Sequence, residues 1–109
     1  MIVYISIGNS DDKLSQVEWN NFINIVDAIV DEWAAQKHGV WFSDPRSPYQ
    51  NACWCVELPD RSSRIALMKG FLAEAAQQYR QDSIAWTEAH EIQFLSLQEW
   101  QKTNGKWQP

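Results

Sequence analysis

A-C-W-C-V-E-L, residues 52–58, alternates between apolar side chains and a second set, which is the pattern of a strand with one buried face. Successive side chains of a strand point to opposite faces of its sheet. The apolar set comprises Ala52, Trp54, Val56 and Leu58. We expect this set to pack against helices, whereas Cys53, Cys55 and Glu57 point to the opposite face. The stretch therefore predicts a sheet with helices on one side.

The helix that precedes this strand has a clear start signal in S-Q-V-E, residues 15–18. Ser15 and Glu18 fit a capping box, in which each side chain satisfies the free backbone N–H of the other residue. An apolar stripe at three- and four-residue steps follows: Trp19, Phe22, Val26, Ile29, Val30 and Trp33. We expect this helix to end near Gln36, with Gly39 as its stop.

A second helix is expected after Pro59, which ends the strand. Its buried stripe is Ile65, Met68, Leu72, Ala75, Ala76 and Tyr79. The remaining strands are expected at residues 2–7, 40–43 and 83–89. Residues 91–96 are either a hairpin partner of the last strand or its continuation past a bulge. Ser96 and Glu99 fit a further capping box and predict a short terminal helix.

The expected order of elements is β-α-β-β-α-β, with an extra strand or short helix at the C-terminus. This order predicts an α+β fold of the ferredoxin-like type, an antiparallel sheet with both long helices on one face. The length of 109 residues suits a single domain, residues 1–109, in which about 97–109 form a short helix and tail. The other face of the sheet is bare unless a partner chain or a ligand covers it.

Charge and composition narrow the classes of partner. The net charge of −5 should repel nucleic-acid backbones, so we expect no nucleic-acid polymer as a partner. The N-terminal residues lack the basic and long apolar segments of a signal peptide. No apolar stretch approaches the ~20 residues that span a membrane. We therefore expect a cytoplasmic protein that does not contact membranes.

The cysteines of the C-W-C stretch raise the possibility of metal or redox chemistry. A disulfide between Cys53 and Cys55 is disfavoured, because Cα atoms two residues apart on a strand are separated by roughly 6.5–7 Å. A metal site needs three or four ligands, and no spacing places His38 or His90 beside the cysteines. We interpret the pair as structural thiols, with a metal site and a reactive thiol as alternatives. We expect no catalytic set, no metal and no cofactor.

Three short segments contain candidate ligand-binding residues. The loop after the first strand holds Asn9 and Ser10, which could accept sugar hydroxyls or a hard cation, although an ordinary turn explains them more simply. The second segment is the first turn of the second helix: Arg61, Ser62, Ser63 and Arg64. Arginines are unfavourable at the positive end of a helix, so an anion site is one hypothesis and solvated ion pairs are the alternative.

The third segment is the loop of residues 44–51, which two prolines stiffen. It offers Arg46, Tyr49 and Asn51 for recognition of a small ligand or a protein, unless it is an ordinary hairpin connection. Arg46 could complete an anion site with the arginines of the second helix.

The open sheet face is the last candidate surface. Alternation predicts that it carries Tyr4, Ser6, Cys53, Cys55 and Glu57. The chain also has seven tryptophans, more than a core of this size is expected to hide. We therefore expect some of them at an interface or a ligand site, where large aromatic side chains give the most contact area.

These features favour a non-catalytic binding module that forms a homo-oligomer. Its ligand would be flat and anionic, such as a nucleotide or a nucleotide-derived signal, with aromatic rings on the base and arginines on the phosphates. Such a protein could sequester its ligand, as some phage-encoded anti-defence proteins do. One alternative is a protein-directed inhibitor or adaptor that acts through exposed tryptophans. A second is a small cofactor-independent enzyme of the dimeric ferredoxin-like type.

Overall fold

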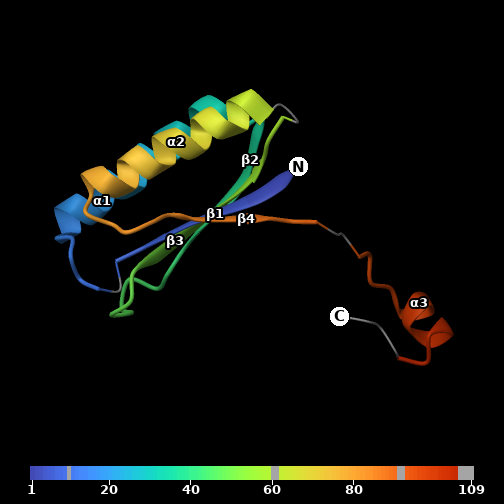
Figure 1. Ribbon diagram of the computed structural model, residues 1–109. Coiled ribbons are helices and arrows are strands. Elements are labelled where there is room, and N and C mark those ends of the chain that lie inside the picture. The colour runs from blue at the N-terminus through green and yellow to red at the C-terminus, as the bar shows by residue number, and fades with distance from the viewer. Residues whose placement is uncertain (10, 60–61, 91–92, 106–109) are drawn as a thin grey trace.

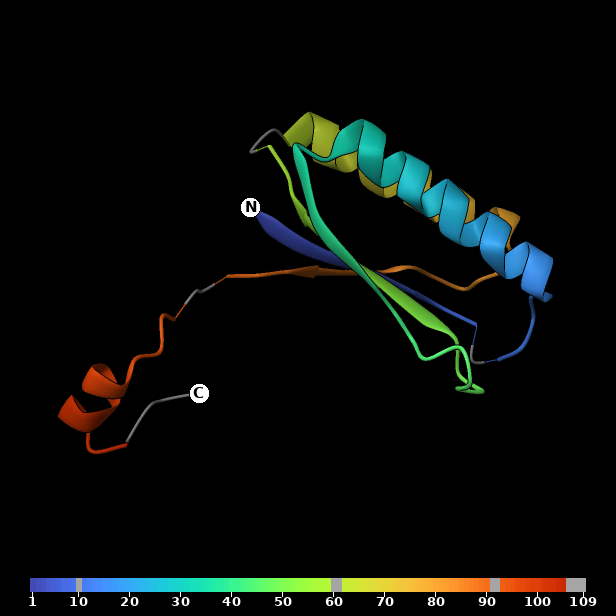
Figure 2. The ribbon, with the colours of Figure 1, turned by 180° about the vertical axis from the view of Figure 1, so that it is seen from behind.

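The computed structural model describes residues 1–9, 11–59, 62–90 and 93–105. Its elements are β1 (Ile2–Gly8), α1 (Gln16–Trp33), β2 (Gln36–Phe42), β3 (Asn51–Glu57), α2 (Ser62–Gln78), β4 (Ala85–Glu88) and α3 (Leu97–Lys102). The described strands form a four-stranded sheet in the order β2-β3-β1-β4, in which every neighbouring pair is antiparallel. Both long helices lie on one side of this sheet (Figures 1 and 2). The prediction of an α+β fold with an antiparallel sheet is confirmed.

The core lies between the sheet and the two long helices. The side chains predicted to face the helices from residues 52–58 are all buried: Ala52, Trp54, Val56 and Leu58. From α1 the buried side chains are Trp19, Phe22, Val26 and Val30, and from α2 they are Met68, Leu72, Ala75 and Ala76. Ile29, Trp33, Ile65 and Tyr79 pack partly buried against them. Both predicted helical stripes are therefore confirmed.

α1 begins where the sequence predicts and ends earlier. The Ser15 hydroxyl accepts the Glu18 backbone N–H at 3.2 Å, and the Glu18 carboxylate accepts the Ser15 backbone N–H at 3.1 Å. The helix ends at Trp33 instead of near Gln36, because Ala34 already has extended backbone angles. Ala35 then donates its N–H to the Glu57 carbonyl at 2.9 Å, which starts the pairing with β3.

β2 is longer than the predicted range of 40–43, because residues from Gln36 onward gain hydrogen bonds to β3. Gly39 lies inside this strand and does not stop the helix. The pairing shifts register between Lys37 and Gly39, which is a β-bulge. Lys37 points to the helix side, where its ammonium group pairs with Asp27 and Asp31 of α1, each at 3.0 Å.

The C-terminal part differs from the predicted pattern. β4 is confirmed within the predicted range of 83–89 and pairs with β1. Residues 93–96 are not in a strand, so the predicted strand over 91–96 is wrong for them; residues 91 and 92 lie outside the described part. The side chains of Phe94 and Leu95 would point to opposite faces of a strand, and both are exposed. Burial of neither side chain therefore stabilises a strand at this position. The predicted short helix is present as α3.

Residues 93–105, called the arm below, extend away from the sheet. In both ribbon views the arm leaves the end of β4 and lies on the side of the sheet opposite the helices (Figures 1 and 2). The radius of gyration is 17.0 Å. A compact chain of this length is expected to have a value of about 13 Å. The arm therefore adds length without adding to the core. Across the described helices, none is both long and apolar enough to cross a membrane.

Candidate functional site

The sheet face that points away from the helices is called the open face below. Directly paired residues of neighbouring strands lie on the same face, so the register defines it. Its side chains are Ile2, Tyr4, Ser6, Gln36, Trp41, Asn51, Cys53, Cys55, Glu57, Ala85 and Thr87. All five residues predicted for this face lie on it. Trp41 was missed, because its face follows from the pairing of β2 with β3 and not from the short predicted strand.

Aromatic side chains stand exposed on the open face. Tyr4 lies on the central strand β1, and Trp41 lies on the edge strand β2 with 59% of its surface exposed. The Tyr4 hydroxyl hydrogen-bonds with the Cys55 thiol, and this contact raises the pKa of Tyr4. Ser6 donates its hydroxyl to Cys53 Sγ at 3.4 Å. The two thiols are thus partnered within the sheet, beside exposed aromatic rings.

The cysteines form no disulfide, and both are half-buried. Within the described ranges, no group of three or more His, Cys, Asp or Glu side chains could hold a metal ion. His38 lies at the bulge of β2, and His90 follows β4. Both imidazoles are exposed, and neither histidine belongs to β3, the strand that carries the cysteines. The open face therefore offers aromatic and thiol contact surface.

The predicted anion-binding arginines lie at opposite ends of the sheet. Arg64 is at the start of α2, and its guanidinium lies 4.8 Å from the centre of the Trp33 ring. Arg46 is in the loop between β2 and β3, beyond the other end of β3. The seven residues of β3 span roughly 20 Å between these ends, at about 3.3 Å per residue. The structure therefore does not bring Arg46 and Arg64 together.

The other predicted members of that site are either outside the described residues or already engaged. Arg61 and Ser10 lie outside them, as does the side chain of Ser62, whereas Ser63 is exposed in the first turn of α2. Arg46 binds Asp44 with two hydrogen bonds of 3.1 and 2.8 Å. This ion pair lowers the pKa of Asp44.

The β2–β3 loop is organised by its own side chains. Asn51 donates its side-chain N–H to the Tyr49 carbonyl at 3.2 Å, and Ser47 donates its hydroxyl to the same carbonyl at 3.2 Å. The Tyr49 ring itself is 62% exposed. The loop therefore presents one aromatic ring, while Asn51 and Arg46 make contacts within the loop.

Asn9 has a structural position. It is buried, and its side-chain amide donates to the Leu14 carbonyl and to Gln50 Oε1, each at 3.0 Å. Its side-chain oxygen accepts the Leu14 N–H at 3.0 Å. Asn9 thus joins the loop before α1 to the β2–β3 loop. These bonds occupy the groups that were predicted to face a ligand.

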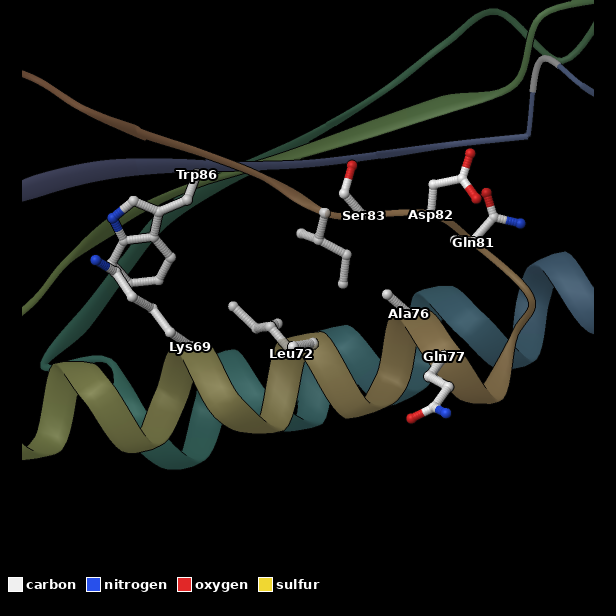
Figure 3. Close-up of a pocket in the computed structure, with 10 residues that line it drawn as sticks. Lys69, Leu72, Ala76, Gln77, Gln81, Asp82, Ser83 and Trp86 are labelled. Carbon is white, nitrogen blue, oxygen red and sulfur yellow. The ribbon is translucent and has the colours of Figure 1, made fainter.

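A groove of about 490 Å³ lies between α2 and the chain that leads into β4 (Figure 3). Its lining residues are Lys69, Leu72, Ala73, Ala76, Gln77, Gln81, Asp82, Ser83, Ile84 and Trp86. The Lys69 ammonium lies 5.0 Å from the centre of the Trp86 ring. Sequence reasoning missed this groove, because it joins one flank of a helix to a segment without any motif.

The arm carries four exposed apolar side chains. Phe94 is 86% exposed, Leu95 66%, Leu97 69% and Trp100 46%. Within Leu97–Lys102, no residue is buried. We expected some tryptophans outside the core, and Trp41 on the open face and Trp100 on the arm are both exposed. Trp107 lies outside the described residues.

The open face and the arm thus each present exposed apolar side chains. Contiguous apolar surface on a soluble protein marks an interaction site more often than isolated apolar side chains do. No protein-family model matches the chain, and no curated protein sequence matches it significantly.

Proposed function

We propose that this protein is a non-catalytic binding module that forms homo-oligomers through its open face. The observation that carries the proposal is the exposure of Tyr4 and Trp41 on a sheet face that no described helix covers. Large aromatic side chains supply most of the energy at protein interfaces. A sheet that has helices on one side buries its other side only when a partner covers it.

The distribution of charge favours a second copy as the partner. Among the side chains that the register places on the open face, Glu57 alone is charged, and it pairs with the Met1 amino group at 2.6 Å. The whole chain has a net charge of −5, so two copies repel one another over most of their surface. Two copies can approach closely where both present uncharged surface.

We also propose that the fold is of the ferredoxin-like type. In support, the strand order from the opposite edge is β4-β1-β3-β2. The two strands that precede the long helices, β1 and β3, then lie side by side in the middle of the sheet, as the split βαβ arrangement requires.

The test of self-association is sedimentation equilibrium of the full chain over a range of concentrations. We expect a dimer or a larger oligomer, and about tenfold weaker association for Trp41→Ser, which removes a large aromatic from the open face. The matched control is Tyr49→Ser, because Tyr49 is 62% exposed and Trp41 59%, but Tyr49 lies on a loop. A monomer at every concentration, or equal loss in both variants, would contradict the proposal.

A second candidate function is binding of a flat anionic ligand, such as a nucleotide, in the groove. The position of the Lys69 ammonium over the Trp86 ring favours it, because a cation and an aromatic ring then face one cavity. The volume of about 490 Å³ suits a small molecule. Sequestration of a nucleotide-derived signal would be the corresponding role.

Adenosine monophosphate and cyclic dinucleotides are suitable probes, with tryptophan fluorescence and thermal shift as readouts. Lys69→Met should reduce the affinity about tenfold, because it removes the cation but retains most of the side-chain volume. Lys13→Met is the control, because Lys13 is exposed on a loop and does not line the groove. The absence of any response to these nucleotides in the unmodified chain would exclude this candidate.

A further inference from the structure

We propose that the arm, residues 93–105, docks on the open face of a second copy, so that two chains exchange arms in a two-fold dimer. This inference rests on the proposed self-association through the open face and names the segment that covers that face. The segment that covers the open face is then the arm of a second copy of this protein.

The large apolar side chains of the arm are not buried by the described residues of their own chain. Phe94, Leu95, Leu97 and Trp100 are all exposed, and α3 stands away from the sheet and the long helices in both ribbon views (Figures 1 and 2). A helix of six residues is not stable in water by itself, because too few hydrogen bonds offset the cost of nucleation. The exposure of these four side chains and the shortness of the helix therefore favour a further surface on which the arm packs.

The sequence nevertheless specifies α3 at both ends. The Ser96 hydroxyl accepts the Glu99 backbone N–H at 3.1 Å, which caps the first turn. Gly105 has a φ of 74° and donates its N–H to the Trp100 carbonyl at 2.9 Å, which closes the last turn. An arm with its helix already specified loses less conformational freedom when it binds.

The arm and the open face both carry little net charge. Glu99 and Lys102 are the charged residues within 93–105, and they pair with each other at 3.4 Å. The arm is therefore neutral overall, as the open face nearly is. A neutral apolar segment can approach an acidic second copy at that face without net repulsion.

Size and symmetry favour exchange between two copies. Large apolar side chains offer about 150–250 Å² each when aromatic and somewhat less for leucine, so the four of one arm expose roughly 500 Å². Two exchanged arms with the surfaces that receive them would bury about 2,000 Å² in total, the size of a stable interface. Each chain carries one arm and one open face. In a two-fold dimer each arm covers the open face of the other copy, so the assembly is closed.

The test uses the full chain and two matched double variants in sedimentation equilibrium. Phe94→Ser with Leu97→Ser removes two apolar contacts of the arm, and we expect association at least about tenfold weaker. Val17→Ser with Leu67→Ser is the control, because both residues are exposed on the outer sides of α1 and α2. We expect the control to associate as the unmodified chain does.

The results separate the two proposals. If the arm variant associates normally while Trp41→Ser does not, the arm inference fails and self-association through the open face stands. If the unmodified chain is monomeric, both fail. Circular dichroism of each variant checks that the sheet and long helices are retained.

A crosslink tests where the arm binds. Gln101→Cys places a thiol on α3 four residues after Leu97, on the same side of that helix. With oxidised glutathione as oxidant, we expect a covalent dimer in which the introduced thiol is joined to Cys53 or Cys55 of the other copy. A closed monomer would mean that the arm folds onto its own sheet and would overturn the exchange, as would the absence of any crosslink. The unmodified chain controls for direct coupling of the native cysteines.

Discussion

The carboxylate of Asp27 in α1 accepts the indole N–H of Trp54 in β3 at 2.9 Å, which joins the longest helix to the middle of the sheet. Trp54 is fully buried, and a buried indole N–H needs an acceptor. Lys37 donates to the same carboxylate oxygen at 3.0 Å. Burial by itself would raise the pKa of Asp27, but the hydrogen bonds from Trp54 and Lys37 outweigh it and lower the pKa.

Removal of this acceptor should destabilise the fold. Asp27→Ala leaves the Trp54 N–H buried without a partner, and we expect the free energy of unfolding to fall by about 1–3 kcal/mol. The control is Asp31→Ala, because Asp31 binds the same Lys37 at 3.0 Å but does not contact Trp54. We expect its loss to stay below about 1 kcal/mol. Urea denaturation measures both, and equal losses would contradict the role of the indole contact.

The same carboxylate should contribute to the pH dependence of stability. The pKa of Asp27 in the folded protein is below its unfolded value, so its contribution is present above the unfolded pKa and is lost as the pH falls through the folded pKa. The difference in unfolding free energy between the unmodified chain and Asp27→Asn should be largest near neutral pH. It should shrink below about pH 3.8, the ordinary pKa of an aspartate. A difference that grows on acidification would refute this sign; Asp31→Asn is the control.

Asn9 should act as a structural residue. Asn9→Ala removes three buried or partly buried hydrogen bonds, to both backbone groups of Leu14 and to Gln50. We expect a loss of about 1–3 kcal/mol in the free energy of unfolding, because the partners in Leu14 lose their acceptor and donor. Asn51→Ala, which removes one exposed side-chain bond to Tyr49, should cost much less. Comparable small losses would show that the two loops do not depend on Asn9.

Gly105 tests the importance of the arm helix. Gly105→Ala adds a Cβ that would lie 2.8 Å from the Trp100 ring, at a positive φ that alanine disfavours. We expect weaker self-association in sedimentation experiments, with little change in the melting temperature of the sheet and long helices. Gly70→Ala is a matched control, because a Cβ there meets nothing within 4 Å and should stabilise α2 by roughly 0.5–1 kcal/mol. If Gly105→Ala associates as the unmodified chain does, the arm helix does not contribute to self-association.

Local signals in the sequence predicted much of the fold. The capping box at Ser15 and Glu18 needs only four residues, so the start of α1 could be predicted to the residue. The alternation of residues 52–58 likewise predicted both faces of β3. The end of α1 could not be predicted in this way, because it depends on pairing between residues 36–42 and β3.

The candidate surfaces were only partly predictable, for the same reason. The face of a strand follows from alternation, so Tyr4 and Cys55 could be assigned to the open face before any register was known. The contact between Asp27 and Trp54 joins residues that are 27 positions apart, and the groove joins α2 to a loop. Such contacts depend on tertiary packing, which short patterns do not encode.

The bulge of β2 affects the tendency of this protein to aggregate as well as the geometry of its sheet. β2 and β4 are the two edges of the described sheet; the first is bulged between Lys37 and Gly39, and the second has four residues. Bulged or short edges are poor templates for the addition of further strands. Growth into fibres by edge-to-edge pairing is thereby hindered at both sides. The protein can therefore expose aromatic surface on its open face with little risk of amyloid-like polymerisation.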